Sequence, residues 1–265
     1  AFANADDAAR YAAALVGQGR QRLYGGVILR FANGLFAATE PLAVPAQGFT
    51  FDWIYPDPIV ATGLYPAGST LVARYSSRVQ QEVPILLSVT QKALYTSMIP
   101  SATLSNLLHR EAHLKREYVF GPQGSVLSYE LSNSTAEVAL KNQLAPRNLV
   151  KVDLADNDIE QAIRAGSLQP DEFVSRVARA GTLRVIVGNA LWGPERPIGT
   201  SFIANVLRPA AFEVRAAFAD PPCTPVCTRA FDAVRHVHLG YEAGAQVAFG
   251  FVLKAEKKPF YMATL

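Results

Sequence analysis

The dipeptide Asn33-Gly34 lies between two apolar runs, and it constrains the fold more than any other local feature. Asn-Gly is the strongest short-range hairpin signal, because both residues can adopt the positive φ angles that a tight turn uses. We therefore predict a β-hairpin over residues 24–38. A helix over residues 6–16, capped by Asn4 or Asp6, is predicted to pack against this hairpin.

The remainder of the first half alternates between strand, helix and loop signals. Residues 41–67 are rich in proline and aromatic side chains, which favours an irregular but ordered loop. Its rings, Phe49, Phe51, Trp53 and Tyr55, either cover a sheet or form a binding surface. The other predicted elements are a strand at Ser69–Tyr75, helices around Ser88–Ser97 and Thr103–Lys115, and a hairpin over Arg116–Tyr129 that turns through Gly121-Pro122-Gln123-Gly124.

A soft boundary near residues 142–150 predicts two domains, 1–148 and 149–265. The pattern helix, glycine, strand, turn, strand occurs in both halves, and either an internal duplication or a common α+β motif explains it. The predicted fold class is α+β, with mixed or antiparallel sheets and flanking helices. In the second half we expect a helix capped by Asp156 or Asn157, a helix from Pro170 to Gly181, and strands at Leu183–Val187, Phe202–Leu207, Phe212–Phe218, Gln246–Leu253 and Phe260–Thr264.

Composition limits the classes of function. Half of the 265 residues are hydrophobic and 18% are charged, so the chain can bury a core and is predicted to be soluble. Uninterrupted apolar stretches such as Val247–Leu253 are far shorter than the ~20 residues of a membrane-spanning helix. The net charge of +3 is evenly distributed, which argues against a nucleic-acid partner. The chain begins at Ala1 rather than Met, which is compatible with a removed secretory leader.

The first half resembles the JAB/MPN family, whose active members are zinc-dependent isopeptidases. It is similar above all to a related bacterial family of uncharacterised domains, some of which occur in secreted toxin-like proteins. The resemblance covers residues 5–132. It is carried by the opening helix, the strand Gly25-Gly26-Val27-Ile28-Leu29 with its hairpin, the strand Leu71-Val72-Ala73-Arg74-Tyr75, and the later hairpin Val119–Val126.

The zinc ligands that the resemblance implies are missing. The family pattern has a glutamate before the glycine-containing strand, then His-x-His, then Ser-x-x-Asp. Here Arg22, Leu23 and Tyr24 precede the glycines, and Tyr75-Ser76-Ser77 stands where His-x-His is expected. Ser88 matches the family serine, but Gln91 replaces the aspartate. The vacated metal-site positions are therefore Tyr75, Ser77, Ser88 and Gln91, and we expect Tyr75, Ser77 and Gln91 to lie near one another.

Two other groups of residues are candidate metal or catalytic sites. His109 and His113 share a helix face with Glu111 between them, although Arg110 stands where a metalloprotease has its glutamate. In the second half, Cys223, Cys227, His236 and His238 form a C-x3-C-x8-H-x-H cluster. This cluster is compatible with zinc, with a Cys223–Cys227 disulfide, with free thiols or with a Cys–His nucleophilic pair.

These observations favour a non-catalytic bacterial module of the binding or effector type, which acts through contact with a partner protein and needs no cofactor. The alternative is a hydrolase, either a diverged peptidase or an enzyme that uses the cysteine–histidine cluster. Zinc held by that cluster is the alternative cofactor. The resemblance is compatible with secretion or with delivery into another cell.

Overall fold

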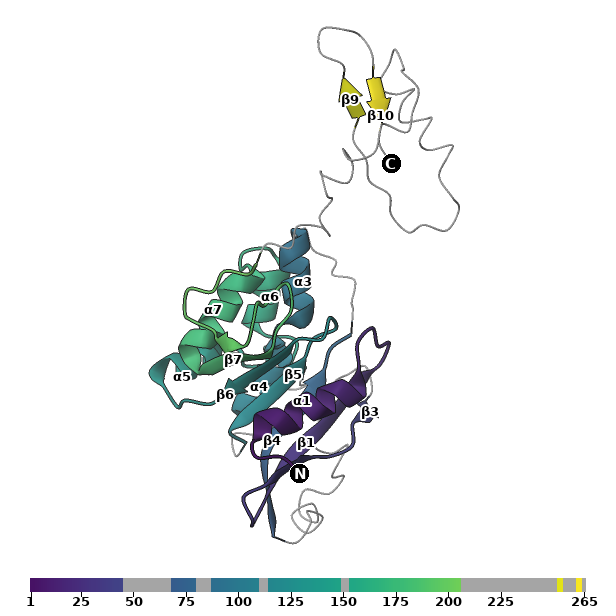
Figure 1. Cartoon of the computed structure of the whole chain (residues 1–265). Coiled ribbons are helices and arrows are strands. Elements are labelled where there is room, and N and C mark those ends of the chain that lie inside the picture. The colour runs from purple at the N-terminus through teal and green to yellow at the C-terminus, as the bar shows by residue number, and fades with distance from the viewer. Residues whose placement is uncertain are drawn as a thin grey trace. The chain divides into compact units, whose positions relative to one another are not determined.

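The computed structural model describes residues 1–44, 68–79, 87–109, 114–148, 153–205, 252–254 and 261–263 (Figure 1). The chain divides into two units, Ala1–Val206 and Leu207–Leu265. In the second unit, β9 (Val252–Lys254) and β10 (Tyr261–Ala263) pair in antiparallel orientation. Both overlap strands that the sequence predicts.

The first unit is built on an eight-stranded sheet in the order β2-β1-β4-β5-β6-β7-β8, with β3 also paired to β1. β4 and β5 are parallel, and the other neighbouring strands are antiparallel. This mixed sheet with flanking helices confirms the predicted α+β class. The strands are β1 (Leu23–Phe31), β2 (Phe36–Ala38), β3 (Leu42–Val44), β4 (Ser69–Ser77), β5 (Arg116–Phe120), β6 (Val126–Glu130), β7 (Thr182–Val187) and β8 (Arg196–Pro197).

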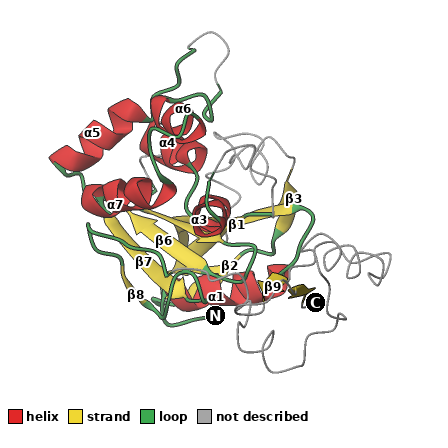
Figure 2. Cartoon of the chain, turned by 90° about the horizontal axis from the view of Figure 1, so that it is seen from above, coloured by secondary structure: helices red, strands yellow, loops and turns green. Residues whose placement is uncertain are grey.

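Helices cover both faces of the sheet unequally. Figure 2 shows α1 (Ala5–Val16) on one face and the other described helices on the opposite face. On that second face, Phe173, Val174 and Val177 line a small apolar cavity together with Leu183 and Trp192. The helices of this face are α3 (Val89–Ser97), α4 (Ser101–His109), α5 (Thr135–Gln143), α6 (Asp158–Arg164) and α7 (Pro170–Ala180).

α1 begins and ends where the sequence predicts. The Asn4 side chain accepts a hydrogen bond from the Asp7 backbone N–H at 2.8 Å, and Gly17, with φ of 72°, follows the last turn. The buried side of the helix consists of alanines, which let the helix approach the sheet closely. They pack on Ile28 and on the rings of Tyr75, Tyr118 and Phe120.

One carboxylate fixes the N-terminal end of α1 to three strand positions. Asp6 accepts hydrogen bonds from the Tyr118 hydroxyl at 2.5 Å, from Arg184 Nη1 at 3.0 Å and from Arg116 Nη1 at 3.2 Å. Its side chain is 15% exposed, so these charge-assisted bonds are only partly screened by water. α1 is therefore held by polar bonds as well as by its alanine face.

The predicted hairpin over residues 24–38 is confirmed, but its turn differs from the predicted one. β1 and β2 pair with Ile28 opposite Ala38, and Arg30 opposite Phe36. Gly34 has a φ of 83°, whereas Asn33 does not have a positive φ. The Gly34 N–H donates to Phe31 O at 2.9 Å, and the Phe31 N–H donates to Leu35 O at 2.8 Å. The loop thus has three residues, a turn followed by one left-handed glycine, instead of two positive-φ residues.

Gly26 lies where no side chain fits. It is opposite Tyr75 on β4, and a Cβ built on Gly26 would lie 2.1 Å from the Tyr75 hydroxyl oxygen and 2.7 Å from Thr39 Oγ1. Tyr75 crosses over the glycine and donates a hydrogen bond to Thr39 O at 2.6 Å. The Val27 N–H donates to Thr39 Oγ1 at 3.0 Å, so Thr39 is bonded to both neighbouring strands. The glycine of the predicted strand is required by this packing.

Four parts of the structure differ from the sequence prediction. α4 is described as far as His109, and Leu114 and Lys115 are not helical, because the Lys115 carbonyl accepts a hydrogen bond from the Leu131 N–H beside the β5–β6 ladder. Residues 202–205 are not a strand, and the Phe202 ring stacks on the Trp192 ring with centroids 5.3 Å apart. β3 occupies the beginning of the predicted loop. In addition, sequence analysis did not predict α5.

The domain boundary predicted between residues 148 and 149 falls inside the first unit. β7 follows that boundary in the sequence and pairs with β6. Their register runs from Glu130 opposite Thr182 to Val126 opposite Val187. Ser132 and Ser134 add to this connection, since both hydroxyls donate to Ala180 O at the end of α7. The division between the units follows Val206 instead.

We predict that Gly26→Ala destabilises the first unit by about 1–3 kcal/mol, because the new methyl group overlaps Tyr75 and Thr39. Gly199→Ala is the matched control, because a Cβ at Gly199 meets nothing within 4 Å. Urea unfolding of both variants measures the effect. Equal unfolding free energies for the two variants would show that the Tyr75 packing is not as close as described.

Candidate functional site

The end of β4 is the part of the sheet to which the resemblance assigns a metal, and its side chains are engaged in structural hydrogen bonds. Ser77 Oγ accepts a bond from the Tyr24 N–H at 2.8 Å, which links β4 to β1. The Tyr75 hydroxyl donates to Thr39 O, as described above. Both side chains are buried. These two side chains therefore attach β4 to strand β1 and to Thr39, the residue after β2.

The other two vacated positions lie at the beginning of α3. Ser88 is the N-cap, and its Oγ accepts a hydrogen bond from the Gln91 N–H at 3.2 Å. The Gln91 carboxamide oxygen accepts from the Asp171 N–H, at 3.3 Å, in the first turn of α7. Among the described residues, no hydrogen bond joins Tyr75 or Ser77 to Ser88 or Gln91. The predicted proximity of β4 and Gln91 stays a prediction.

The chemistry of the vacated positions does not suit a metal. Hydroxyls and a carboxamide replace the two imidazoles and the carboxylate that hold zinc in the family to which the resemblance points. Burial raises the pKa of Tyr75 to about 12, so its phenol stays protonated and cannot serve as an anionic ligand near neutral pH. The described residues include no cluster of three or more His, Cys, Asp or Glu side chains arranged to hold a metal ion.

A buried ion pair on the other side of β4 was missed by sequence reasoning. Arg74 Nε donates to Glu117 Oε2 at 2.6 Å, and the two side chains are 2% and 0% exposed. Ser76 Oγ donates to the other carboxylate oxygen at 3.2 Å. Arg74 and Glu117 are direct neighbours in the parallel β4–β5 register. The signal that could have indicated this pair is a charged residue next to apolar neighbours in each strand, Arg74 between Ala73 and Tyr75, and Glu117 before Tyr118 and Val119.

Two arginines lie at the carboxyl ends of β4 and β5, where a ligand site often forms in sheets with parallel strands. Arg20 donates through Nε to Arg78 O at 3.1 Å, and through Nη2 to Phe120 O and Gly121 O at 2.6 and 2.9 Å. Arg78 donates to the Thr96 and Tyr95 carbonyls at the end of α3. Burial lowers the pKa of both guanidinium groups. Because these donors already bind carbonyls, the pair acts as a clamp on the chain.

Glu160 of α6 forms a third polar cluster. Its carboxylate accepts from the Tyr95 hydroxyl at 2.5 Å, from Ser101 Oγ at 2.8 Å and from Arg164 Nε at 3.0 Å. Burial and this carboxylate raise the pKa of Tyr95 to about 12. The cluster joins α3, α4 and α6, and its carboxylate accepts from three side-chain donors. It is suited to holding helices together.

The remaining predicted candidates lie wholly or partly outside the described residues. His109 is described, and its Nδ1 lies 3.0 Å from Ser105 O within the same helix. Its predicted partners Glu111 and His113 are outside the described residues. So are the aromatic residues at 49–55 and the whole cysteine–histidine cluster: Cys223, Cys227, His236 and His238.

An exposed apolar surface lies on the outward side of α1. Tyr11 and Leu15, one helical turn apart, are 50% and 53% exposed, and Ala14 beside them is also exposed. The Phe2 ring lies 5.3 Å from the Tyr11 ring. We call Tyr11, Ala14 and Leu15 the α1 face. Val89, Val138 and Ile203 are also exposed, but they belong to separate parts of the chain.

We predict that Glu117→Gln lowers the unfolding free energy by about 3 kcal/mol or more, because it leaves the Arg74 charge buried without its carboxylate. Asp158→Asn is the control. Its ion pair with Arg147 is 3.7 Å long with side chains 54% and 75% exposed, so the expected change is within about 0.5 kcal/mol. Urea denaturation measures both, and similar losses would contradict the assignment of Arg74–Glu117 as a main support of the sheet.

We predict that stability falls above pH 10. The native pKa values of Tyr75 and Tyr95, about 12, exceed the value near 10 of an unfolded tyrosine. Between these values the unfolded chain releases protons that the native chain retains. Between pH 10 and pH 12, each tyrosine then lowers the unfolding free energy by up to about 1.4 kcal/mol per pH unit. Below pH 10, the stabilisation that comes from its raised pKa is fully present. Urea unfolding at a series of alkaline pH values should give a shallower slope for Tyr75→Phe and Tyr95→Phe, and unchanged slopes would refute the assignment.

Comparison with known proteins gives no relative for this chain. No family model matches it, and no curated protein or solved structure matches it either. None of the described helices combines the length and the apolar character that crossing a membrane would require. Functional inference therefore depends on the contacts of the chain itself.

Proposed function

We propose that the first unit is a non-catalytic binding module that acts by contact with another protein. The resemblance to bacterial toxin-associated domains supports an effector-type role. The observation that carries the proposal is that the four vacated metal-site positions already form structural hydrogen bonds. Tyr75, Ser77, Ser88 and Gln91 each take part in a hydrogen bond that holds a strand or a helix end. Hydrolytic chemistry at these four positions would first require one of these structural contacts to break.

The surface that we assign to the partner is the α1 face. Tyrosine is enriched in protein interfaces because its ring covers a large apolar area and its hydroxyl can still bind water or a partner. Leu15 extends this apolar area by one turn, and Phe2 supports the Tyr11 ring from the side. The partner in this proposal presents a complementary apolar patch to Tyr11 and Leu15.

A photo-crosslinking side chain placed at residue 15 of the 265-residue chain tests the proposal in the producing cells. We expect a discrete crosslinked protein species at residue 15 and none at residue 138, because Val138 is equally exposed, at 57%, but lies on α5. Tyr11→Ser should reduce the crosslink at residue 15 severalfold while it changes the unfolding free energy by less than about 0.5 kcal/mol.

Two outcomes would contradict the proposal. The first is crosslinking of the same strength at residues 15 and 138, because a specific contact must distinguish two equally exposed apolar positions. The second comes from metal analysis and peptidase assays on the same purified chain. Stoichiometric zinc together with hydrolytic activity that chelation abolishes would favour the hydrolase alternative.

A further inference from the structure

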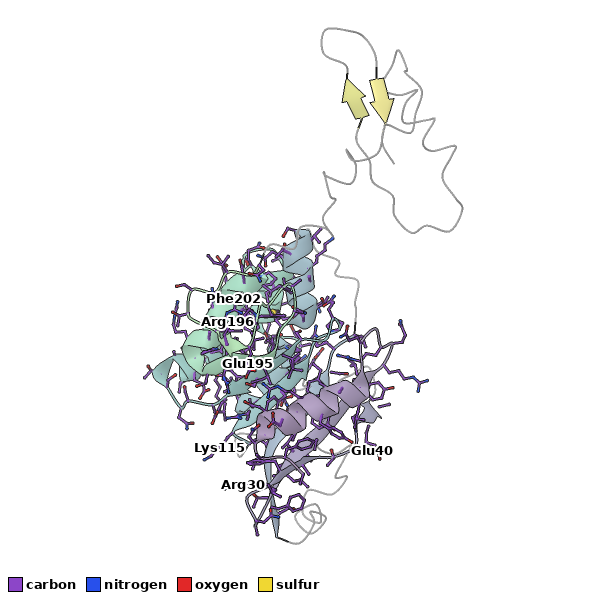
Figure 3. The ribbon with its side chains drawn as sticks, viewed as in Figure 1. Arg30, Glu40, Lys115, Glu195, Arg196 and Phe202 are labelled. Atoms are coloured by element: carbon purple, nitrogen blue, oxygen red, sulfur yellow. The ribbon has the colours of Figure 1, made fainter. Side chains whose placement is uncertain are left out.

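The tip of the β1–β2 hairpin presents a reactive dipeptide that the proposed function does not use. Asn33 is exposed, and glycine follows it. The Asn33 carboxamide oxygen accepts a hydrogen bond from the Leu35 N–H at 3.0 Å, so the side chain is folded back over the main chain of the turn. Figure 3 shows the neighbouring Arg30 at the same end of the first unit.

We propose that Asn33 is a site of spontaneous covalent modification, in which water converts its carboxamide into a carboxylate through a cyclic imide. The Gly34 nitrogen attacks Asn33 Cγ and loses its proton, and the new N–Cγ bond closes a five-membered ring. The Cγ–Nδ2 bond breaks, and Nδ2 takes up the proton that the Gly34 nitrogen released and leaves as ammonia. Water then opens the imide at either carbonyl. The product is aspartate, or isoaspartate in which the main chain runs through the side-chain carbon.

The geometry of the turn favours the first step in two ways. Glycine has no Cβ, so no side chain hinders the approach of its nitrogen to Asn33 Cγ. The Leu35 N–H already donates to Asn33 Oδ1, the oxygen on which negative charge develops during the attack. One bond opposes the reaction, because the Gly34 N–H donates to Phe31 O at 2.9 Å. This bond must open first, and it lies at the hairpin tip, where local opening costs least.

The modification would change the strand pairing beside α1. Isoaspartate adds a methylene group to the main chain, which cannot keep both the Gly34–Phe31 and Phe31–Leu35 bonds of the three-residue loop. Phe36 follows directly and pairs with Phe2 through two hydrogen bonds of 2.7 and 2.8 Å. Phe2 in turn contacts Tyr11 of the α1 face. The reaction at Asn33 therefore reaches the edge of the sheet on which the α1 face depends.

The test is incubation of the folded 265-residue chain at mildly alkaline pH, followed by peptide mass spectrometry that separates aspartate from isoaspartate. Asn133 is the internal control, because it is also exposed and lies in a loop, with φ of 56°, but precedes Ser134. We expect conversion at Asn33 severalfold faster than at Asn133, a rate that rises with pH, and isoaspartate among the products.

Conversion of Asn33 no faster than Asn133 in the folded chain would overturn the proposal. Conversion of Asn33 only after urea unfolding would also overturn it, because the turn would then protect the site. A variant, Asn33→Ser, should remove the mass change from this peptide and leave the Asn133 peptide as before. A persistent mass change in that variant would place the reaction elsewhere and refute the assignment.

Discussion

The pairing of β4 with β5 joins the two hairpin systems into one sheet. β4 is antiparallel to β1, and β5 is antiparallel to β6, so among the described strands the parallel β4–β5 ladder is the pairing that joins the β1–β2 hairpin and β4 to the β5–β6 hairpin. Parallel strands need a long crossover, and α3 and α4 lie in it. The ladder sets Arg74 opposite Glu117 on one face and Tyr75 opposite Tyr118 on the other. Both faces of the unit are therefore organised by one strand register.

The elements predicted correctly from sequence are those with local signals. The two hairpins have glycine-containing turns between apolar runs, and α1, α3 and α6 have polar caps followed by helical periodicity. The β6–β7 pairing could not be read from local patterns, because more than fifty residues separate the partners. α5 was overlooked although Ser134 and Glu137 have capping-box spacing, since its short apolar pattern is weak.

The roles of the polar residues were harder to predict, because a residue type does not reveal whether its hydrogen bonds are already used. The sequence indicates that Tyr75, Ser77, Ser88 and Gln91 replace metal ligands. It does not reveal that Ser77 binds the Tyr24 amide or that Gln91 binds the first turn of α7. Arg74 and Glu117 were missed for a related reason. A charge within a strand is usually solvent-facing, and burial here is possible only because each charge meets the other across the ladder.

α1 is held by a small apolar interface and by several charged hydrogen bonds. Together they determine how firmly the helix presents the residues on its outward side. Alanines bury little area each, so the alanine face alone contributes modestly to holding the helix. Asp6, bonded to Tyr118, Arg116 and Arg184, fixes the first turn, and Arg10 adds bonds to Ile186 O and Glu195. A helix held in this way presents Tyr11 and Leu15 on a preorganised backbone. A partner that contacts them loses less conformational entropy than it would by ordering a loop.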